Sequence, residues 1–426
     1  MNQIEEWMNS RIGLNFRSGL GRMQQAVKLL GDPYKTVPMI HVTGTNGKGS
    51  TIAFMRQLFQ QHSLKVGTFT SPHIVSIHDR ICINGQPISD QDLIRLGQSI
   101  QTMESQLLET HDQLSYFEII TLLAFLYFHE QKVDLALIEV GIGGFLDTTN
   151  VITGEVALIT SVGLDHQETL GGSLEAIATQ KAGIFKAGKP AVIGPLAEEA
   201  ERVCIEKAQG TGCSLARYGE DFQLVKGVFQ DAHHRFDSLK IGLNGAYQEE
   251  NAAVALEAFL LFMDQRGLAV DENGVREALQ ATSWPGRLEN FGQGVYLDGA
   301  HNPHAIHRLV EYARTFSDKR VRILYGALKR KDYKGMLEIF ASDLPEADLT
   351  VTTFAYGEVV QEDDGLGYPY VADFRDYLQD FYSRQDGQEV LFVTGSLYFI
   401  SEVRAYLLEQ GKNPYRRWYS THNHKD

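Results

Sequence analysis

The segment from His41 to Thr51, HVTGTNGKGST, has the composition of a loop that binds phosphate. It follows the apolar run MIHV, which predicts a buried strand, and precedes the run TIAFMRQLFQQH, which predicts a helix. Glycines let a backbone approach an anion closely, and the N-terminus of a helix attracts negative charge. Lys48 would reach the terminal phosphates of a nucleotide. The sequence therefore predicts a nucleotide-binding loop, with a plain glycine-rich turn as the alternative.

This loop departs from the standard phosphate-binding pattern G-x-x-x-x-G-K-[ST] at two positions. Val42 occupies the place of the first glycine, and Gly49 follows the lysine. Gly49 has no hydroxyl, so the oxygen that usually contacts Mg²⁺ at this place is missing. A bound Mg²⁺ must then take its oxygen ligands partly from other segments.

Three polar residues follow other predicted strands and are candidates for this role. Ser71 follows TFT, Glu139 ends LALIEV, and His166 follows ALITSVGLD. Ligands of an open parallel sheet gather at the carboxyl ends of its strands. A carboxylate with few other protein ligands is typical of Mg²⁺ sites, whereas a histidine is less typical. Each residue alone is better explained by a structural function, but the set predicts a metal site.

The second half of the chain offers a further polar loop in YLDGAHNPHA, where Asp298 and His301 lie between a predicted strand and a predicted helix. These side chains suit contact with a ribose, a phosphate or a reacting carboxylate. Arg287, in WPGRLEN, would lie at a hinge between domains and could bind phosphate when the domains close. The alternative for Arg287 is a linker residue in solvent.

The elements that must position these residues alternate between short β-branched runs and longer helical stretches, which predicts an α/β fold with a parallel sheet. The stretch from about Leu215 to Gly242 has a less regular pattern and predicts antiparallel hairpins. Pro285-Gly286 breaks both helix and strand, and the alternation restarts beyond it. The sequence thus predicts a larger P-loop ATPase-like domain in residues 1–285, a linker in 286–295 and a smaller Rossmann-like α/β domain in 296–426.

Composition narrows the classes of partner. The formal net charge of −15 argues against binding to nucleic acid or to an anionic membrane surface. The first residues lack the apolar core of a signal peptide, and no window approaches the roughly 20 apolar residues of a membrane span. Cys82, Cys204 and Cys213 are too scattered for a disulfide framework or a zinc cluster. We therefore expect a cytoplasmic protein. We also expect a monomer that acts on small molecules.

Along nearly its whole length the chain resembles the folylpolyglutamate synthase/dihydrofolate synthase family, a branch of the Mur ligases. The motifs that carry the resemblance occur in the family's order: GLGRMQQAVKLLGDP, HVTGTNGKGS, TSPHIVSIHDRICING, YFEIITLLAF, EVGIGGFLDTTNV, TSVGLDHQETLGGSLEAIATQKAGI, WPGRLEN, LDGAHNP and VTGSLYFISEV. The loop GTNGKGS, the KAGI segment and LDGAHNP form a highly specific combination.

The resemblance implies a function for each matching residue. ATP is expected on the loop formed by Gly44, Thr45, Asn46, Gly47, Lys48, Gly49 and Ser50. Further nucleotide contacts are implied at Asn251, Arg287, Asp298 and His301. Mg²⁺, in two sites, is expected at Ser71, Glu139, His166 and near Lys181, whose counterpart in relatives is carbamylated. Residues of the pterin side are implied at Arg80, Phe117 and Asp147.

The implied reaction is ATP-dependent ligation of L-glutamate to dihydropteroate or tetrahydrofolate through an acyl phosphate, with Lys48, Glu139, His166 and Lys181 as catalytic residues. The sequence leaves open which of the two acceptors is used, or whether both are. Two other hypotheses are a Mur-type ligase acting on a cell-wall precursor and a non-enzymatic nucleotide-binding switch. The chain departs from the family pattern at three positions. Phe145 stands where the family often has arginine, Gln180 where it usually has glutamate, and Tyr247 where it often has histidine.

Overall fold

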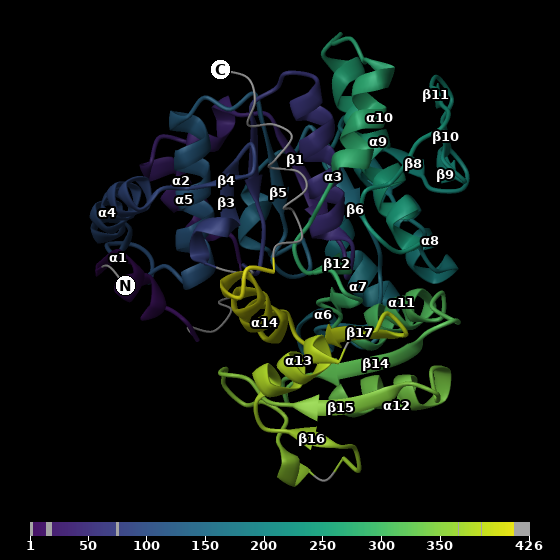
Figure 1. Cartoon of the computed structure of the whole chain (residues 1–426). Helices are drawn as coiled ribbons and strands as arrows, with labels where there is room; N and C mark the ends of the chain where they lie inside the picture. Colours follow the sequence, from purple (N-terminus) through teal and green to yellow (C-terminus); the bar gives the residue numbers. More distant parts are fainter. Residues whose placement is uncertain (1–2, 14–18, 74–75, 365, 385, 413–426) are drawn as a thin grey trace, which may run out of the picture. The chain divides into compact units, whose positions relative to one another are not determined.

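The computed structural model describes residues 3–13, 19–73, 76–364, 366–384 and 386–412. The C-terminal segment THNHKD, which we expect to be a solvated terminus and not a metal site, lies outside the described residues. The chain forms two compact units, Met1–Gly242 with Gln248–Thr282 and Leu243–Tyr247 with Ser283–Asp426. Each unit contains a mainly parallel sheet with helices against it (Figure 1), which confirms the predicted α/β class.

The first unit is built on an eight-stranded sheet with the order β4-β3-β2-β5-β1-β6-β7-β8. Strands β2, β5, β1, β6, β7 and β8 are parallel, and β3 and β4 pair antiparallel at one edge. Their bounds are β1 Met39–Thr43, β2 Val66–Phe69, β3 Ile81–Ile83, β4 Gln86–Pro87, β5 Leu135–Glu139, β6 Val156–Ile159, β7 Pro190–Ile193 and β8 Ser214–Arg217. The carboxyl ends of β2, β5, β1 and β6 therefore lie side by side, at the edge where ligands of such sheets bind.

Helices lie on both faces of this sheet (Figure 1). Met39, Phe69 and Ile138 belong to one apolar core with α1, α2, α4 and α5, while α3 packs on α9 through Phe59 and Phe259. Because both faces are covered, every residue of β1 and β5 is buried, and most of these residues are apolar. The helices are α1 Gln3–Asn9, α2 Gly21–Leu29, α3 Lys48–Gln61, α4 Asp90–Leu107, α5 Tyr116–Glu130, α6 Gln167–Leu170, α7 Leu174–Lys181, α8 Glu198–Thr211, α9 Tyr247–Gln265 and α10 Glu272–Ala281.

The stretch from Leu215 to Gly242 differs in part from the prediction. Strands β9 (Gln223–Val225), β10 (Val228–Gln230) and β11 (Arg235–Phe236) do form an antiparallel sheet. Strand β8, however, pairs parallel with β7 and extends the large sheet. A short alternating run does not say which strand it will pair with, because that choice is made by tertiary packing.

The second unit has a six-stranded sheet with the order β12-β13-β17-β14-β15-β16, in which only β12 is antiparallel to its neighbour. The strands are β12 Glu289–Asn290, β13 Val295–Leu297, β14 Arg320–Tyr325, β15 Asp348–Thr352, β16 Tyr370–Val371 and β17 Glu389–Thr394. The helices are α11 Pro303–Ala313, α12 Tyr333–Asp343, α13 Phe374–Ser383 and α14 Leu397–Glu409. Pro303 begins α11, where its missing N–H costs no helical hydrogen bond.

Five short 3₁₀ turns complete the described elements: η1 Pro33–Thr36, η2 Ile77–Arg80, η3 Thr148–Val151, η4 Ala182–Ile184 and η5 Glu362–Asp364. Among the helices of the described ranges, none combines the length and the apolar character that a bilayer span requires.

One buried acid lies on α9. Glu257 is 6% exposed, and its Oε2 atom has no hydrogen-bond partner among the described residues. Burial, with further contributions from Asp231, Asp221 and Asp264, raises the pKa of Glu257 to about 8. Between about pH 4.5 and pH 8, the folded chain therefore keeps Glu257 protonated, whereas the unfolded chain has released this proton.

This difference predicts a pH-dependent stability. A raised pKa in the folded state means that the contribution of Glu257 is complete below about pH 4.5 and is lost as pH rises to about 8. Glu257→Gln does not titrate, so its melting temperature should exceed that of the unchanged chain by at least about 2 °C above pH 8 and lose this advantage near pH 5. Differential scanning calorimetry measures both, with exposed Glu277→Gln as the control. A constant difference between the two chains at every pH would contradict the assignment.

Candidate functional site

The loop between β1 and α3 takes a backbone course that only glycine accepts at two points. Gly47 has φ +87°, and a Cβ atom there would lie 2.4 Å from Asn251 Oδ1. A Cβ atom on Gly44 would lie 1.9 Å from Thr160 Oγ1. Real Cβ atoms do not approach other atoms so closely, and left-handed φ values favour glycine. The loop thus runs close against α9 on one side and the end of β6 on the other.

Hydrogen bonds from the end of β6 hold the loop in place. The Thr45 N–H donates to the Ser161 carbonyl at 3.0 Å, and the Asn46 N–H donates to Ser161 Oγ at 2.9 Å. Thr160 Oγ1 donates to the Asn46 carbonyl at 2.5 Å. The Gly163 N–H donates to Thr45 Oγ1 at 3.0 Å. The loop is therefore preorganised, which lowers the conformational cost of binding a ligand there.

The sequence did not single out Thr160 or Ser161 as part of the site. Their signal is the pair of hydroxyl residues directly after the apolar run VALI, at a strand end that faces the loop.

The first turn of α3 receives further support from α9. Ser50 is buried, and its Oγ accepts a hydrogen bond from Gln248 Nε2 at 3.4 Å. Asn251 Nδ2 donates to Gln248 Oε1 at 2.9 Å. Asn251, predicted from the resemblance, therefore lies against the loop although it is about 200 residues away in the chain.

Lys48, Glu139 and Ser71 converge at the ends of three neighbouring strands. Lys48 Nζ donates to the Gly44 carbonyl at 2.8 Å and lies 3.9 Å from Glu139 Oε1. The Ser71 N–H donates to Glu139 Oε2 at 3.0 Å. The Glu139 side chain is 5% exposed, so its charge is compensated here by an ammonium group and a backbone dipole. The strand-end prediction thus correctly placed Ser71 and Glu139 beside the phosphate-binding loop.

His166 lies at the start of α6, in a left-handed conformation with φ +51°. Its N–H donates to Asp165 Oδ1 at 2.9 Å, and its Nε2 lies 3.9 Å from Asp165 Oδ2. The side chain is 43% exposed. In the described part of the chain, Glu139 and His166 are not joined by a third His, Cys, Asp or Glu in one converging group. The structure thus shows Ser71 in contact with Glu139, and a shared metal site with His166 stays a prediction.

Lys181 ends α7 and is 3% exposed. Burial, with a smaller contribution from the positive charge of Lys48, lowers the pKa of Lys181 to about 7, against the attraction of Asp165 and Asp147. The loop after β5 packs directly onto this helix end, because the Phe145 N–H donates to the Gln180 carbonyl at 2.8 Å. Lys181 is thus a buried amine whose nearest charges belong to the site.

Asp147 is buried, and its carboxylate accepts hydrogen bonds from residues of its own loop. Its Oδ2 accepts from the Ile142 N–H at 3.0 Å, and its Oδ1 accepts from the Thr149 N–H at 3.0 Å and from Thr149 Oγ1 at 2.5 Å. Burial raises the pKa of Asp147, and these hydrogen bonds oppose that rise. The geometry gives Asp147 a positioning function for the loop after β5, while a contact with a pterin stays a prediction.

Phe117 and Arg80 lie near the same strand ends. The Phe117 ring faces Phe69 at 5.8 Å between centroids and approaches Gly141, whose added Cβ would lie 2.7 Å from the ring. Arg80 donates from Nε to His73 Nδ1 at 3.0 Å and lies 5.8 Å from the centroid of the Tyr116 ring. Burial and the nearby Arg80 lower the pKa of His73 to about 4, so a neutral imidazole accepts this bond.

The second unit brings Arg287, Asp298 and His301 together. Asp298 is buried and accepts from the N–H groups of Leu288 at 3.0 Å and Ala300 at 2.9 Å. Burial raises the pKa of Asp298, and the positive charge of Arg287 opposes this. His301 Nδ1 donates to the Gly299 carbonyl at 2.8 Å. Arg287 is partly buried beside Gly299, which disfavours the alternative of a linker arginine in solvent, while its contact with a nucleotide stays a prediction.

Comparisons with known proteins agree with this arrangement. Residues 42–259 match the model of the Mur ligase middle domain, and residues 286–397 match that of the Mur ligase, glutamate ligase domain. The dihydrofolate synthase/folylpolyglutamate synthase of Bacillus subtilis (strain 168) is 35% identical, over 93% of this chain and 97% of the relative.

Two solved structures are similar over almost the whole chain. A folylpolyglutamate synthase (FPGS) in complex with AMPPCP and folate has a TM-score of 0.85 and 32% identity, covering 96% of this chain and 100% of the other. E. coli FolC in complex with DHPP and ADP has a TM-score of 0.85 and 28% identity, covering 96% and 99%. The chain belongs to the folylpolyglutamate synthase/dihydrofolate synthase family of the Mur ligases.

Proposed function

We propose that this ligase joins L-glutamate to the carboxylate of dihydropteroate or a folate, with ATP converted to ADP and phosphate. The observation that carries the proposal is the convergence of Lys48, Glu139 and Ser71 at a preorganised glycine loop. Relatives with this combination of domains are named for both dihydrofolate and folylpolyglutamate synthesis, and related structures contain folate or a nucleotide.

The reaction needs two displacements, because a carboxylate and an amine do not condense spontaneously in water. A carboxylate oxygen of the acceptor attacks the γ-phosphorus of ATP, and the bond to the β–γ bridging oxygen breaks, which releases ADP and forms an acyl phosphate. The amine of glutamate then attacks the acyl carbon, the carbon–oxygen bond to phosphate breaks, and the amine loses a proton. The amide product and inorganic phosphate remain.

The chain contributes mainly position and charge to these steps. The N–H groups at the start of α3 and the Lys48 ammonium would face the phosphates and stabilise charge that develops during transfer. The loop Gly44–Ser50 would hold the nucleotide in line with the acceptor, since its backbone is already fixed by β6 and α9. We carry over Asn251, Arg287, Asp298 and His301 as further nucleotide contacts, and Arg80 and Phe117 as pterin contacts, from the resemblance.

The residues beside the loop fit Mg²⁺. A carboxylate from Glu139 and a hydroxyl from Ser71 are the hard oxygen ligands that this ion prefers, and the ion keeps several waters or phosphate oxygens in its shell. We propose Glu139, Ser71 and His166 as its protein ligands. When bound, the ion would neutralise phosphate charge and orient the leaving group.

Lys181 fits a second, modified site. A lysine must be neutral to react with carbon dioxide, and the pKa of about 7 leaves roughly half of its amines neutral at pH 7. Carbamylation would replace a buried cation with a carboxylate-like group near the loop. Its negative charge would also suit a second Mg²⁺.

A monomeric state and a cytoplasmic location stay proposals as well. Unpaired Cys82, Cys204 and Cys213 support a reducing compartment.

The assay that tests the function uses purified protein, MgATP and L-glutamate with dihydropteroate or tetrahydrofolate in parallel. We expect glutamate-dependent ADP release and an amide product with at least one of the two acceptors, and products from both would show a bifunctional enzyme. ADP release with a nucleotide-sugar peptide precursor alone, or ADP release that does not depend on glutamate and gives no amide, would overturn the proposal.

Glu139→Gln should lower kcat by at least about a hundredfold at saturating Mg²⁺, because it removes the charge that holds the ion while it keeps an oxygen for the Ser71 N–H. Glu139→Ala should abolish ligation with the fold intact. Glu155→Gln, which breaks a surface ion pair with Lys189, is the matched control and should stay near normal. Near-normal turnover of Glu139→Ala would refute the metal assignment.

Carbamylation of Lys181 can be read directly by ¹³C NMR of the protein in labelled bicarbonate. The carbamate signal should grow as pH rises from about 6 to about 8, since the neutral amine reacts and the pKa is near 7. The signal should disappear in Lys181→Arg and persist in Lys189→Arg. Its persistence in Lys181→Arg would assign the carbamate to another lysine.

A further inference from the structure

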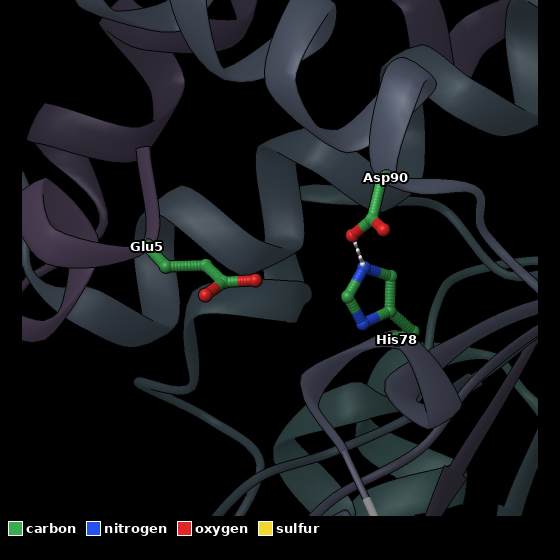
Figure 2. Close-up of side chains that lie close together, drawn as sticks. All are labelled: Glu5, His78 and Asp90. Carbon is green, nitrogen blue, oxygen red and sulfur yellow. Dashed lines mark ion pairs between the residues drawn. The ribbon is translucent and has the colours of Figure 1, made fainter. Parts of the chain in front are cut away.

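Three potential metal ligands from separate parts of the first unit lie close together. Glu5 lies on α1, His78 on η2, and Asp90 is the first residue of α4. One ligand atom from each lies within 4.8 Å of the other two. Figure 2 shows the Glu5 carboxylate directed toward the imidazole of His78, with Asp90 on the side of its ring nitrogen.

The contact between His78 and Asp90 has the length of a hydrogen bond but not its direction. His78 Nε2 lies 3.0 Å from Asp90 Oδ1, yet this buried nitrogen has no partner in hydrogen-bond geometry among the described residues. A short distance combined with a poor hydrogen-bond angle is what two ligands of one metal ion show. The ion lies along the lone-pair direction of the nitrogen, and the carboxylate oxygen lies off that axis.

The other ring nitrogen of His78 is already engaged. Nδ1 lies 3.3 Å from Ser76 Oγ. With Nδ1–H donating to this hydroxyl, Nε2 keeps a lone pair for a metal ion, as in metal-binding histidines whose second nitrogen is held by a neighbour. Ser76 is itself fixed, since its N–H donates to Asp79 Oδ2 at 3.0 Å in a capping box at the start of η2.

Packing also fixes the position of Glu5. Its neighbour Ile4 is 3% exposed and lies so close to α4 that a Cβ atom on Gly97 would be 2.4 Å from Ile4 Cγ2. Gly97 and Asp90 are seven residues apart, about two helical turns, so they lie on the same side of α4. The contact that seats α1 therefore also places Glu5 near Asp90.

We propose that Glu5, His78 and Asp90 bind one divalent transition-metal ion of the Zn²⁺ class, with water completing its shell. One imidazole and two carboxylates suit zinc, which binds such ligands at about 2.0–2.2 Å. Ligand atoms around such an ion stand roughly 3–4 Å apart, so the present spacing needs only a small adjustment of side chains. The ion links α1 to η2 and α4, and restrains the segment that ends in Arg80.

Binding is tested on the full chain, stripped of metal and kept in excess Mg²⁺ so that oxygen sites for Mg²⁺ are filled. Isothermal titration with Zn²⁺, and elemental analysis after gel filtration, should give one tight equivalent for the unchanged chain. His78→Ala should lose this equivalent, and Glu5→Gln should weaken it at least tenfold. Ser76→Ala should weaken it about 10–100-fold, because the hydroxyl that orients the imidazole is removed.

His307→Ala is the matched control, since His307 forms a similar ion pair with Asp343 at 3.1 Å on the second unit. It should bind Zn²⁺ as the unchanged chain does. Melting temperatures in metal-free buffer show whether each variant folds, and Glu5→Gln and Ser76→Ala decide the matter if His78→Ala does not. No tight equivalent in the unchanged chain, or the same affinity in Glu5→Gln and Ser76→Ala, would overturn the site and leave an ion pair.

Discussion

The close contact of the Gly44–Lys48 backbone with the end of β6 and with α9 is the constraint on which the site depends. There is no room for a side chain at Gly47, because Asn251 occupies the space where a Cβ atom would lie. The loop cannot relax away, since Thr160 and Ser161 bind its carbonyl and N–H groups. The order of strands β2, β5, β1 and β6 therefore places Ser71 and Glu139 beside this loop.

Charge in this region is arranged locally in a chain that is acidic as a whole. Lys48 is held by the Gly44 carbonyl and lies near Glu139, while Lys181 is buried close enough for the positive charge of Lys48 to lower its pKa. Two ammonium groups in one buried region repel each other, and that repulsion is relieved if one of them loses its charge. This explains in physical terms why a lysine, rather than a residue that is always charged, suits position 181.

The amino-acid sequence predicted the fold class and the meeting of Lys48, Ser71 and Glu139, because glycine spacing and strand ends are local features with a fixed consequence in a parallel sheet. It did not predict the functions of Thr160, Ser161 and Gln248, whose contacts depend on how β6 and α9 pack. The partner of β8 was missed for the same reason. Asp147 was assigned to the pterin side, but its three hydrogen bonds to its own loop are invisible in a motif.

The outermost strands of the two large sheets bear on how this protein avoids edge-to-edge pairing with other chains. Strands β4, β12 and β16 each contain two residues, and β4 ends in Pro87, which has no N–H to offer. The longer edge strand β8 ends in Arg217, which pairs with Glu201 and lies near Asp221. Short, proline-bearing or charged borders give a second chain little to extend, so the molecule is guarded against edge-to-edge aggregation during synthesis and storage.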